Sequence, residues 1–425
     1  MSILEIGAFL IGLSAAFGYL NYRYLRLPHT IGLVIIAMAA SLVIILIEVL
    51  SPASPIMEIV TGVLTQIDFH ETVMRGMLSF LLFAGALHVD FTAFKSRASA
   101  IALMATLGIL ISTFLIGWMT WFILNAFGIE MPFIWALVFG ALISPTDPVA
   151  VLGLFKTVNV PETLEAKMAG EALFNDGVGV VIFTVMVAVA VGGNGHGGDV
   201  DAWFVAELFF TEAVGGAVLG LLAGYAGYRA MLHIDEHNLE VLITLALVMV
   251  TYAVALRLHM SGPIAMVVAG LFIGNQGMKY AASETTRDYI KKFWSLIDEI
   301  LNSVLFLLIG LEVLVIAKLV DHVGVALLII PVTLAARWFS VFVPISILSR
   351  WGSFTKGAIP ILTWGGLRGG IAVALALSLP PNEYKPTILT VTYAVVLFSI
   401  IVQGLTIKPL VERIVTQGKL QEPPA

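Results

Sequence analysis

The chain is long, apolar and poor in charge. Of its 425 residues, 59% are hydrophobic and only 12% are charged, whereas an ordinary soluble domain is about 25% charged. A soluble core could not cover so much apolar surface, but a lipid bilayer can. The net charge of −6 argues against a nucleic-acid partner, and the absence of cysteine excludes disulfides, thiolate metal sites and cysteine nucleophiles.

Thirteen apolar segments are candidates for membrane-spanning helices, each of which needs roughly 20 residues. The first is predicted to be a retained span, because the only charge before its apolar run is Glu5, where a signal peptide carries Lys or Arg. In chain order the predicted spans cover residues 3–20, 30–50, 73–90, 98–125, 133–155, 164–191, 203–229, 239–257, 261–276, 293–317, 322–349, 356–379 and 387–412.

The positions of Lys and Arg predict the orientation, because cytoplasmic loops carry an excess of positive charge. With the N-terminus outside, sixteen of the 22 Lys and Arg residues fall on the cytoplasmic side and four outside, while Arg337 and Arg368 lie within spans. We therefore expect a multi-pass membrane protein. Its N-terminus is predicted outside, and its C-terminus, with a short tail at 414–425, in the cytoplasm.

The two halves of the chain predict an inverted repeat. An odd number of spans with opposite termini allows the first six spans to repeat as the last six, with the seventh as a connector. The fifth span is interrupted at residues 144–148 and the twelfth at residues 365–370, which are corresponding positions. Paired interruptions are the best indication from sequence of a transporter's binding site. We expect an all-α protein whose two interrupted helices cross.

Asp147 stands between two prolines in the fifth span. Pro148 lacks an N–H and its ring collides with the carbonyl of Ser144, and Pro145 disturbs the preceding turn in the same way. The helix should unwind here and free carbonyls that can coordinate a cation. A proline kink is the ordinary alternative, but it needs no carboxylate in the bilayer, where an ionisable group costs several kcal/mol.

Asn175 and Asp176 lie in the sixth span, within the sequence GEALFNDGVG at 170–179. Glycines in this segment allow a neighbouring helix to approach closely. The Asp176 carboxylate can bind either a cation or a proton, and this competition is the minimal chemistry of antiport. The alternatives are an acid neutralised by a structural Arg and, for Asn175, an amide that serves packing alone.

Three further ionisable residues fall inside spans. Glu171 lies one turn before Asn175 and shares its face of the helix. A buried pair between Glu171 and Arg337 would neutralise both charges, and we expect this pair to be structural. Arg368, in the twelfth-span interruption, could bind a freed carbonyl, extend to the interface, or repel cations from a leak path.

Four motifs together resemble the monovalent cation:proton antiporter-1 family, which includes the bacterial NhaP-type proteins and the animal sodium–proton exchangers. They are FLLFAGALHVD at 80–90, SPTDPVA at 144–150, GEALFNDG at 170–177 and WGGLRGG at 364–370. The resemblance implies an NhaA-like antiporter fold over residues 1–413. It also implies a homodimer, with a moving core near 73–191 and 293–412 and a dimerisation part near 1–50 and 203–276.

The resemblance implies roles for individual residues. Asp176 resembles the family's essential ion- and proton-carrying Asp, and Asp147 and Thr146 match its unwound-helix motif. Asn175 matches the Asn that marks the electroneutral branch of the family. Na⁺ is therefore expected at Asp176 and Asp147, with Li⁺ or K⁺ as open alternatives. No cofactor is expected besides the transported cation and proton.

Glu171 and Arg337 match a structural ion pair of the family, but two other positions depart from its pattern. Many members have Ser after the matched Glu, where this chain has Ala172. Some bacterial members have a carboxylate in the third span, where this chain has Ala84. Both changes remove oxygen ligands, so backbone carbonyls near Thr146 or water would have to complete the coordination of the ion.

The favoured function is electroneutral exchange of one Na⁺ for one proton at Asp176, by a secondary active transporter and not an enzyme. A K⁺/H⁺ antiporter on the same scaffold is the nearest alternative. A cation channel is disfavoured because no filter-like run of carbonyls appears. An intramembrane protease is disfavoured because neither HExxH nor a Gly-x-Ser-x-Gly motif with His and Asp partners occurs.

Overall fold

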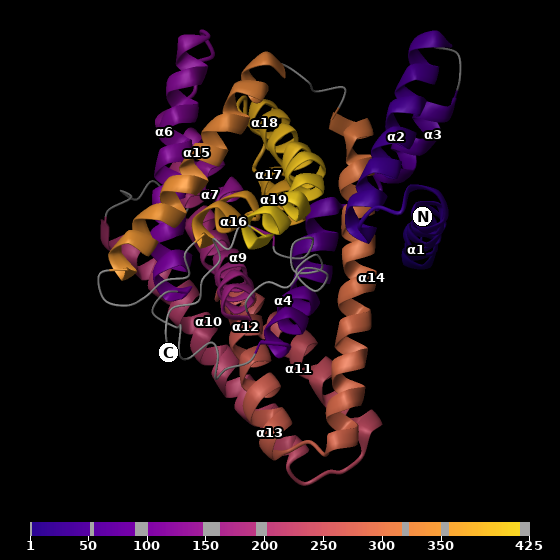
Figure 1. Cartoon of the computed structure of the whole chain (residues 1–425), viewed down its shortest axis with the longest axis vertical. Helices are drawn as coiled ribbons and strands as arrows, with labels where there is room; N and C mark the ends of the chain where they lie inside the picture. Colours follow the sequence, from indigo (N-terminus) through magenta and orange to yellow (C-terminus); the bar gives the residue numbers. More distant parts are fainter. Residues whose placement is uncertain are drawn as a thin grey trace.

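The computed structural model describes residues 2–51, 55–89, 101–147, 162–192, 202–316, 323–349 and 357–416. All regular elements in these ranges are helices, which confirms the all-α architecture (Figure 1). Segments labelled η are π-helical turns between or beside α-helices. The elements are α1 (Ile3–Leu20), η1 (Asn21–Leu25), α2 (His29–Leu50), α3 (Ile56–Leu64), η2 (Glu71–Met77), α4 (Leu78–Leu87), η3 (Met104–Gly108), α6 (Ile109–Ala126), α7 (Phe133–Ile143), α9 (Glu162–Val191), α10 (Ala202–Met231), α11 (His237–Arg257), α12 (Gly262–Phe272), η4 (Ile273–Gly277), α13 (Met278–Tyr280), α14 (Glu284–Ile316), α15 (Val323–Leu348), α16 (Ala358–Trp364), α17 (Gly370–Ser378), α18 (Lys385–Phe398), η5 (Ser399–Gln403) and α19 (Gly404–Thr416).

Nine helices within the described ranges are long and apolar enough to cross a membrane, and α7 is a shorter apolar helix. The predicted number of thirteen spans therefore stays a prediction. The described helices fall within or overlap every predicted span. The predicted spans at 133–155 and 356–379 contain short or interrupted helices, because proline and glycine end the helical hydrogen bonding inside them. The predicted span at 261–276 is α12, which begins at Gly262-Pro263 and continues as η4.

Two elements differ from the expected boundaries. α14 begins at Glu284, whereas the predicted span begins at 293. The polar residues before 293 continue the helix, and the Asp288 carboxylate accepts a bond from the Lys292 ammonium at 2.7 Å, one turn away. α3, at Ile56–Leu64, is a short helix in a segment that the sequence analysis placed between spans.

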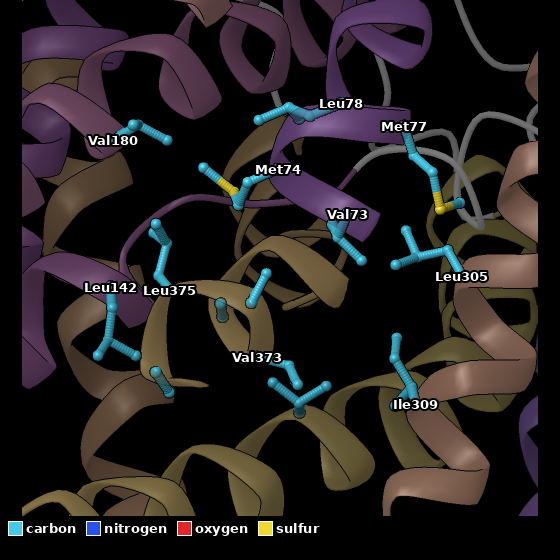
Figure 2. Packing of buried hydrophobic residues seen from close by; sticks show 14 of the residues in the cluster. Val73, Met74, Met77, Leu78, Leu142, Val180, Leu305, Ile309, Val373 and Leu375 are labelled. Atoms are coloured by element: carbon cyan, nitrogen blue, oxygen red, sulfur yellow. The ribbon is translucent and has the colours of Figure 1, made fainter. Parts of the chain in front are cut away.

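Close helix contacts hold the bundle together. A Cβ at Gly140 of α7 would meet the carbonyl of Thr113 on α6, and one at Gly310 of α14 would meet Ala37 on α2. Small residues at such contacts let backbones approach closely. In the interior, apolar side chains from η2, α4, α7, α9, α14 and α17 form one core, part of which is shown in Figure 2.

The outer helices keep large apolar side chains exposed. These residues lie along α2 and α10 and include Leu42, Leu46, Val49, Phe210, Val214, Val218 and Leu222. In a bilayer, lipid tails cover such faces as favourably as protein does. Buried polar residues occur in several parts of the bundle, and one group of them lies where the interrupted helices meet.

Candidate functional site

The two predicted interruptions meet in the middle of the structure. α7 ends at Ile143 with Ser144 as its C-cap, and residues 145–147 continue without helical structure. On the other side, α16 ends at Trp364 and α17 begins at Gly370. The Asp147 N–H donates to the Leu367 carbonyl at 2.8 Å and closes an isolated antiparallel bridge. We call residues 144–147 and 365–369 the crossing. Pro148, which the sequence analysis assigned to the first interruption, lies outside the described residues.

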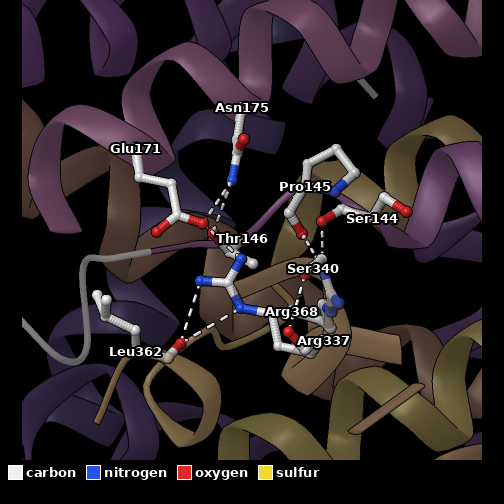
Figure 3. A network of polar contacts seen from close by, with 9 residues as sticks. All are labelled: Ser144, Pro145, Thr146, Glu171, Asn175, Arg337, Ser340, Leu362 and Arg368. Atoms are coloured by element: carbon white, nitrogen blue, oxygen red, sulfur yellow. Dashed lines mark hydrogen bonds and ion pairs between the residues drawn. The ribbon is translucent and has the colours of Figure 1, made fainter. Parts of the chain in front are cut away.

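Arg368 binds the end of α7 across the crossing. Its Nη1 donates to the carbonyls of Ser144 and of Pro145, the latter at 2.9 Å (Figure 3). The backbone N–H of Arg368 donates to Ser399 Oγ at 2.9 Å. Of the three roles considered for this side chain, the contacts show binding of freed carbonyls. These two carbonyls are therefore already engaged by a cationic side chain, which also offsets the negative end of the α7 dipole.

A buried ion pair lies beside the crossing. Arg337 Nη1 and Glu171 Oε1 are 2.5 Å apart, and both side chains are almost fully buried. The guanidinium also donates to the Leu362 carbonyl, from Nε at 3.3 Å and from Nη2 at 3.1 Å (Figure 3). Arg337 thus connects α15 to α9 and to α16, next to the second interruption.

The Asn175 side chain connects the ion pair to the crossing. Its Nδ2 lies 3.4 Å from Thr146 Oγ1 and 3.4 Å from Glu171 Oε1. Asn175 Oδ1 and Glu171 Oε2 are buried and have no hydrogen-bond partner among the described residues. Buried acceptors are nearly always satisfied in proteins, so these two oxygens are candidate ligands for a water or a cation.

Asp176 is buried on α9 without a neutralising partner in the described part of the chain. It is 7% exposed, and neither a hydrogen bond nor an ion pair to it occurs there. The nearby Asp147 adds its negative charge to the surroundings of Asp176. The alternative of an acid neutralised by a structural Arg therefore finds no support in these ranges. A cation or a proton between the two carboxylates would relieve their repulsion.

The glycines of the second interruption make room for these charges. A Cβ at Gly369 would collide with the Asp147 side chain, and one at Gly366 would collide with the Arg337 guanidinium. Ala84 and Ala172, the two departures from the family pattern, are both buried and contribute no oxygen. The side-chain oxygens near the crossing therefore include those of the two aspartates, Ser144, Thr146, Asn175 and Glu171.

Gly369→Ala should damage the crossing. The added methyl group must displace the Asp147 carboxylate, and overpacking of this kind typically costs about 1–3 kcal/mol. We expect a lower melting temperature and slower cation-driven proton flux in proteoliposomes. Gly12→Ala, on α1, is the matched control, because a Cβ there meets nothing within 4 Å. Wild-type stability and flux in Gly369→Ala would contradict the packing described here.

Some polar residues of the core were not identified from sequence. Ser399, which accepts from the Arg368 N–H, follows an ordinary apolar helix and carries no local signal. Glu312 does carry a local sequence signal, because it is an acid near the end of an apolar run. In the structure its side chain is buried, with 9% exposed. The rule that marks Asp147, namely that acids within spans are functional candidates, marks Glu312 as well.

Comparison with known proteins identifies relatives over the whole length. Residues 12–413 match the family described as sodium/hydrogen exchanger, transmembrane. The chain is 46% identical to the Na⁺/H⁺ antiporter NhaP of Pseudomonas aeruginosa, over 99% of each chain. It is 35% identical to the Na⁺/H⁺ antiporter NhaH of Halobacillus dabanensis, over 92% of this chain and 93% of that one.

A solved structure has the same fold. The sodium proton antiporter MjNhaP1 from Methanocaldococcus jannaschii superposes with a TM-score of 0.78, over 98% of this chain and 100% of that one. The two sequences are 19% identical. The likeness extends from α1 to α19, so the interrupted helices belong to a fold that is already known.

Proposed function

This chain belongs to the sodium/hydrogen exchanger family, and we propose that it exchanges Na⁺ for H⁺ as a secondary active transporter. Full-length relatives named as Na⁺/H⁺ antiporters support this choice of ions and disfavour the K⁺/H⁺ alternative. Membership of a transporter family also supports the expectation that the chain is not an enzyme.

The observation that carries the proposal is the pair of acids at the crossing. Asp176 is buried, has no neutralising partner in the described ranges, and is influenced by the charge of Asp147. We propose that Na⁺ and a proton bind here in turn, with Asp176 as the shared group. Thr146 and the free Oδ1 of Asn175 would supply neutral oxygens. Because Na⁺ and the proton compete, acidic pH should raise the apparent KM for Na⁺.

The proposed mechanism is alternating access. The interrupted helices carry Asp147 and Arg368 on peptides that are not helical, so small movements of α7, α16 and α17 can change the exposure of the site. Glu171 and Arg337 hold the core together while it moves. A bound Na⁺ or proton neutralises part of the charge at the crossing, which makes passage of the core across the bilayer less costly.

We propose a stoichiometry of one Na⁺ for one proton. Asn175 cannot titrate, Glu171 is paired, and the place of Asp147 in the unwound-helix motif favours a role in orienting the helix ends, which leaves Asp176 as the exchanging carboxylate. No net charge then moves, so the rate should not depend on voltage. A single transported charge would be worth about 2.3 kcal/mol per 100 mV and would be visible. The test is Na⁺-driven proton flux in proteoliposomes at several clamped potentials.

A steep voltage dependence, or a potential generated by an imposed Na⁺ gradient, would contradict this stoichiometry. It would direct attention to Asp147 or Glu171 as a second proton carrier. The same preparation compares Na⁺, Li⁺ and K⁺ directly. Since Ala84 and Ala172 offer no oxygen to a cation, the order of the three ions tests how well the remaining ligands select Na⁺.

We propose that the protein lies in a bacterial inner membrane as a homodimer, with its N-terminus outside and its C-terminus in the cytoplasm. The distribution of Lys and Arg supports this orientation. The exposed apolar faces of α2 and α10 support a surface shared between lipid and a second copy. They lie within the segments 1–50 and 203–276 that we assign to the dimerisation part, beside the moving core.

A further inference from the structure

Glu312 is a buried acid on α14 that the mechanism above does not use. It is 9% exposed, and within the described ranges it neither accepts a hydrogen bond nor forms an ion pair. A carboxylate in such a position is costly unless something neutralises it. The small exposed fraction shows that protein leaves part of its surface uncovered.

The position of Glu312 follows from the geometry of α14. Leu305 packs against Gly370, so this level of α14 touches the first residue of α17, next to the crossing. Seven residues are nearly two helical turns, which places Glu312 on almost the same face and about 10 Å further along the axis. Figure 2 shows Leu305 and Ile309 of this face pointing toward the core, with Val373 of α17 nearby. Glu312 thus lies on the core side of α14.

A second unsatisfied group lies within electrostatic range of Glu312. The Tyr393 hydroxyl on α18 is buried, has no hydrogen-bond partner among the described residues, and is influenced by the charge of Glu312. Buried tyrosine hydroxyls usually find a partner. Glu312 also stands four residues before the end of α14, where the negative end of the helix dipole favours a cation.

We propose that Glu312 and Tyr393 form a second binding site for the transported monovalent cation, on the side of the core toward which α14 ends. The carboxylate supplies the charge and the hydroxyl supplies a neutral oxygen. The site would concentrate the cation on one route to the crossing. This inference rests on the proposed exchange, and it adds a residue pair whose effect is confined to one face of the membrane.

The expected effect follows from Coulomb's law. At an effective dielectric constant of about 20, removing the unit charge of Glu312 weakens cation binding at the second site itself by roughly tenfold or more. Because this site lies on the route from one face only, the effect belongs to that face. Glu312→Gln should therefore raise the KM for Na⁺ about tenfold at the face toward which α14 ends. The KM at the opposite face and the maximal rate should stay near the wild-type values. Tyr393→Phe keeps the charge and should give a smaller rise at the same face.

The experiment measures the KM for Na⁺ separately at each face of proteoliposomes. The chain has no cysteine, so one Cys at exposed Ser51, present in all variants, reports orientation through an impermeant thiol reagent. Glu58→Gln is the matched control, because Glu58 is exposed on α3, which packs against α14. It should leave both KM values unchanged.

Unchanged KM values in Glu312→Gln, or equal shifts at both faces, would overturn the second site. If that variant does not fold, Glu312→Asp and Tyr393→Phe decide the question in the same assay. The absence of a face-specific shift in both would overturn the site equally. A wild-type protein without Na⁺/H⁺ exchange would instead overturn the proposed function, and the second site with it.

Discussion

Asp176→Asn is expected to abolish Na⁺-driven proton exchange while leaving a folded protein in the membrane. The amide is nearly isosteric with the carboxylate, so the buried position keeps its packing. It can neither release a proton nor carry a negative charge, however, so both halves of the exchange are lost together. Folding should suffer little, because no hydrogen bond or ion pair from the described residues depends on the Asp176 carboxylate.

The measurement compares proton flux in proteoliposomes driven by a Na⁺ gradient, together with the melting temperature of the purified protein. Asp235→Asn is the matched control, because it makes the same chemical change at an exposed position between α10 and α11. It should exchange at the wild-type rate. Substantial Na⁺-driven flux in Asp176→Asn would rule out this residue as the shared site, and the search would move to Asp147.

The interruptions and the ion pair were predictable from sequence because their causes are local. Proline removes a backbone donor and glycine weakens a helix, so the breaks near Pro145 and Gly366 follow from the residues themselves. The helical period places Glu171 on the same face as Asn175. The expectation that a buried Arg must have an acid partner then directs attention from Arg337 to Glu171, which it contacts.

The contacts across the crossing could not be predicted, because they join distant parts of the chain. Arg368 and Ser144 are 224 residues apart in sequence, and no local pattern states that one binds the carbonyl of the other. The bond from the Asp147 N–H to the Leu367 carbonyl also joins residues far apart in sequence, so it was unpredictable for the same reason. Sequence identified both interruptions, but only the fold shows that each completes the hydrogen bonding of the other.

Boundaries set by polarity were less predictable for a physical reason. The predicted span begins at 293, whereas α14 begins at Glu284. Hydropathy locates the part of a helix that lies in the membrane and not the end of the helix. A helix continues into water where charged side chains one turn apart interact, as Asp288 and Lys292 do. Glu312 shows the opposite case, since an acid near the end of a predicted span is expected at the membrane surface, whereas the structure buries it.

Arg337→Ala is expected to lower the free energy of unfolding by about 3–5 kcal/mol, because it leaves the Glu171 carboxylate buried and unpaired. The substitution also removes the two bonds that the guanidinium donates to the Leu362 carbonyl. Adding Glu171→Gln should restore part of the loss, since a neutral amide is less costly to bury than an unpaired charge. The measurement is thermal or denaturant unfolding of the four proteins of this double-mutant cycle in detergent.

The exposed pair between Arg75 and Glu71 provides the control for the Arg337 experiment. Its N–O distance of 2.7 Å is close to the 2.5 Å of the buried pair, but its side chains are 63% and 56% exposed. Exposed pairs of this kind contribute about 0–1 kcal/mol, so Arg75→Ala should change stability little. The decisive quantity is the coupling in the cycle. If the effects of Arg337→Ala and Glu171→Gln simply add, the two side chains do not stabilise each other, and Arg337 acts through Leu362 alone.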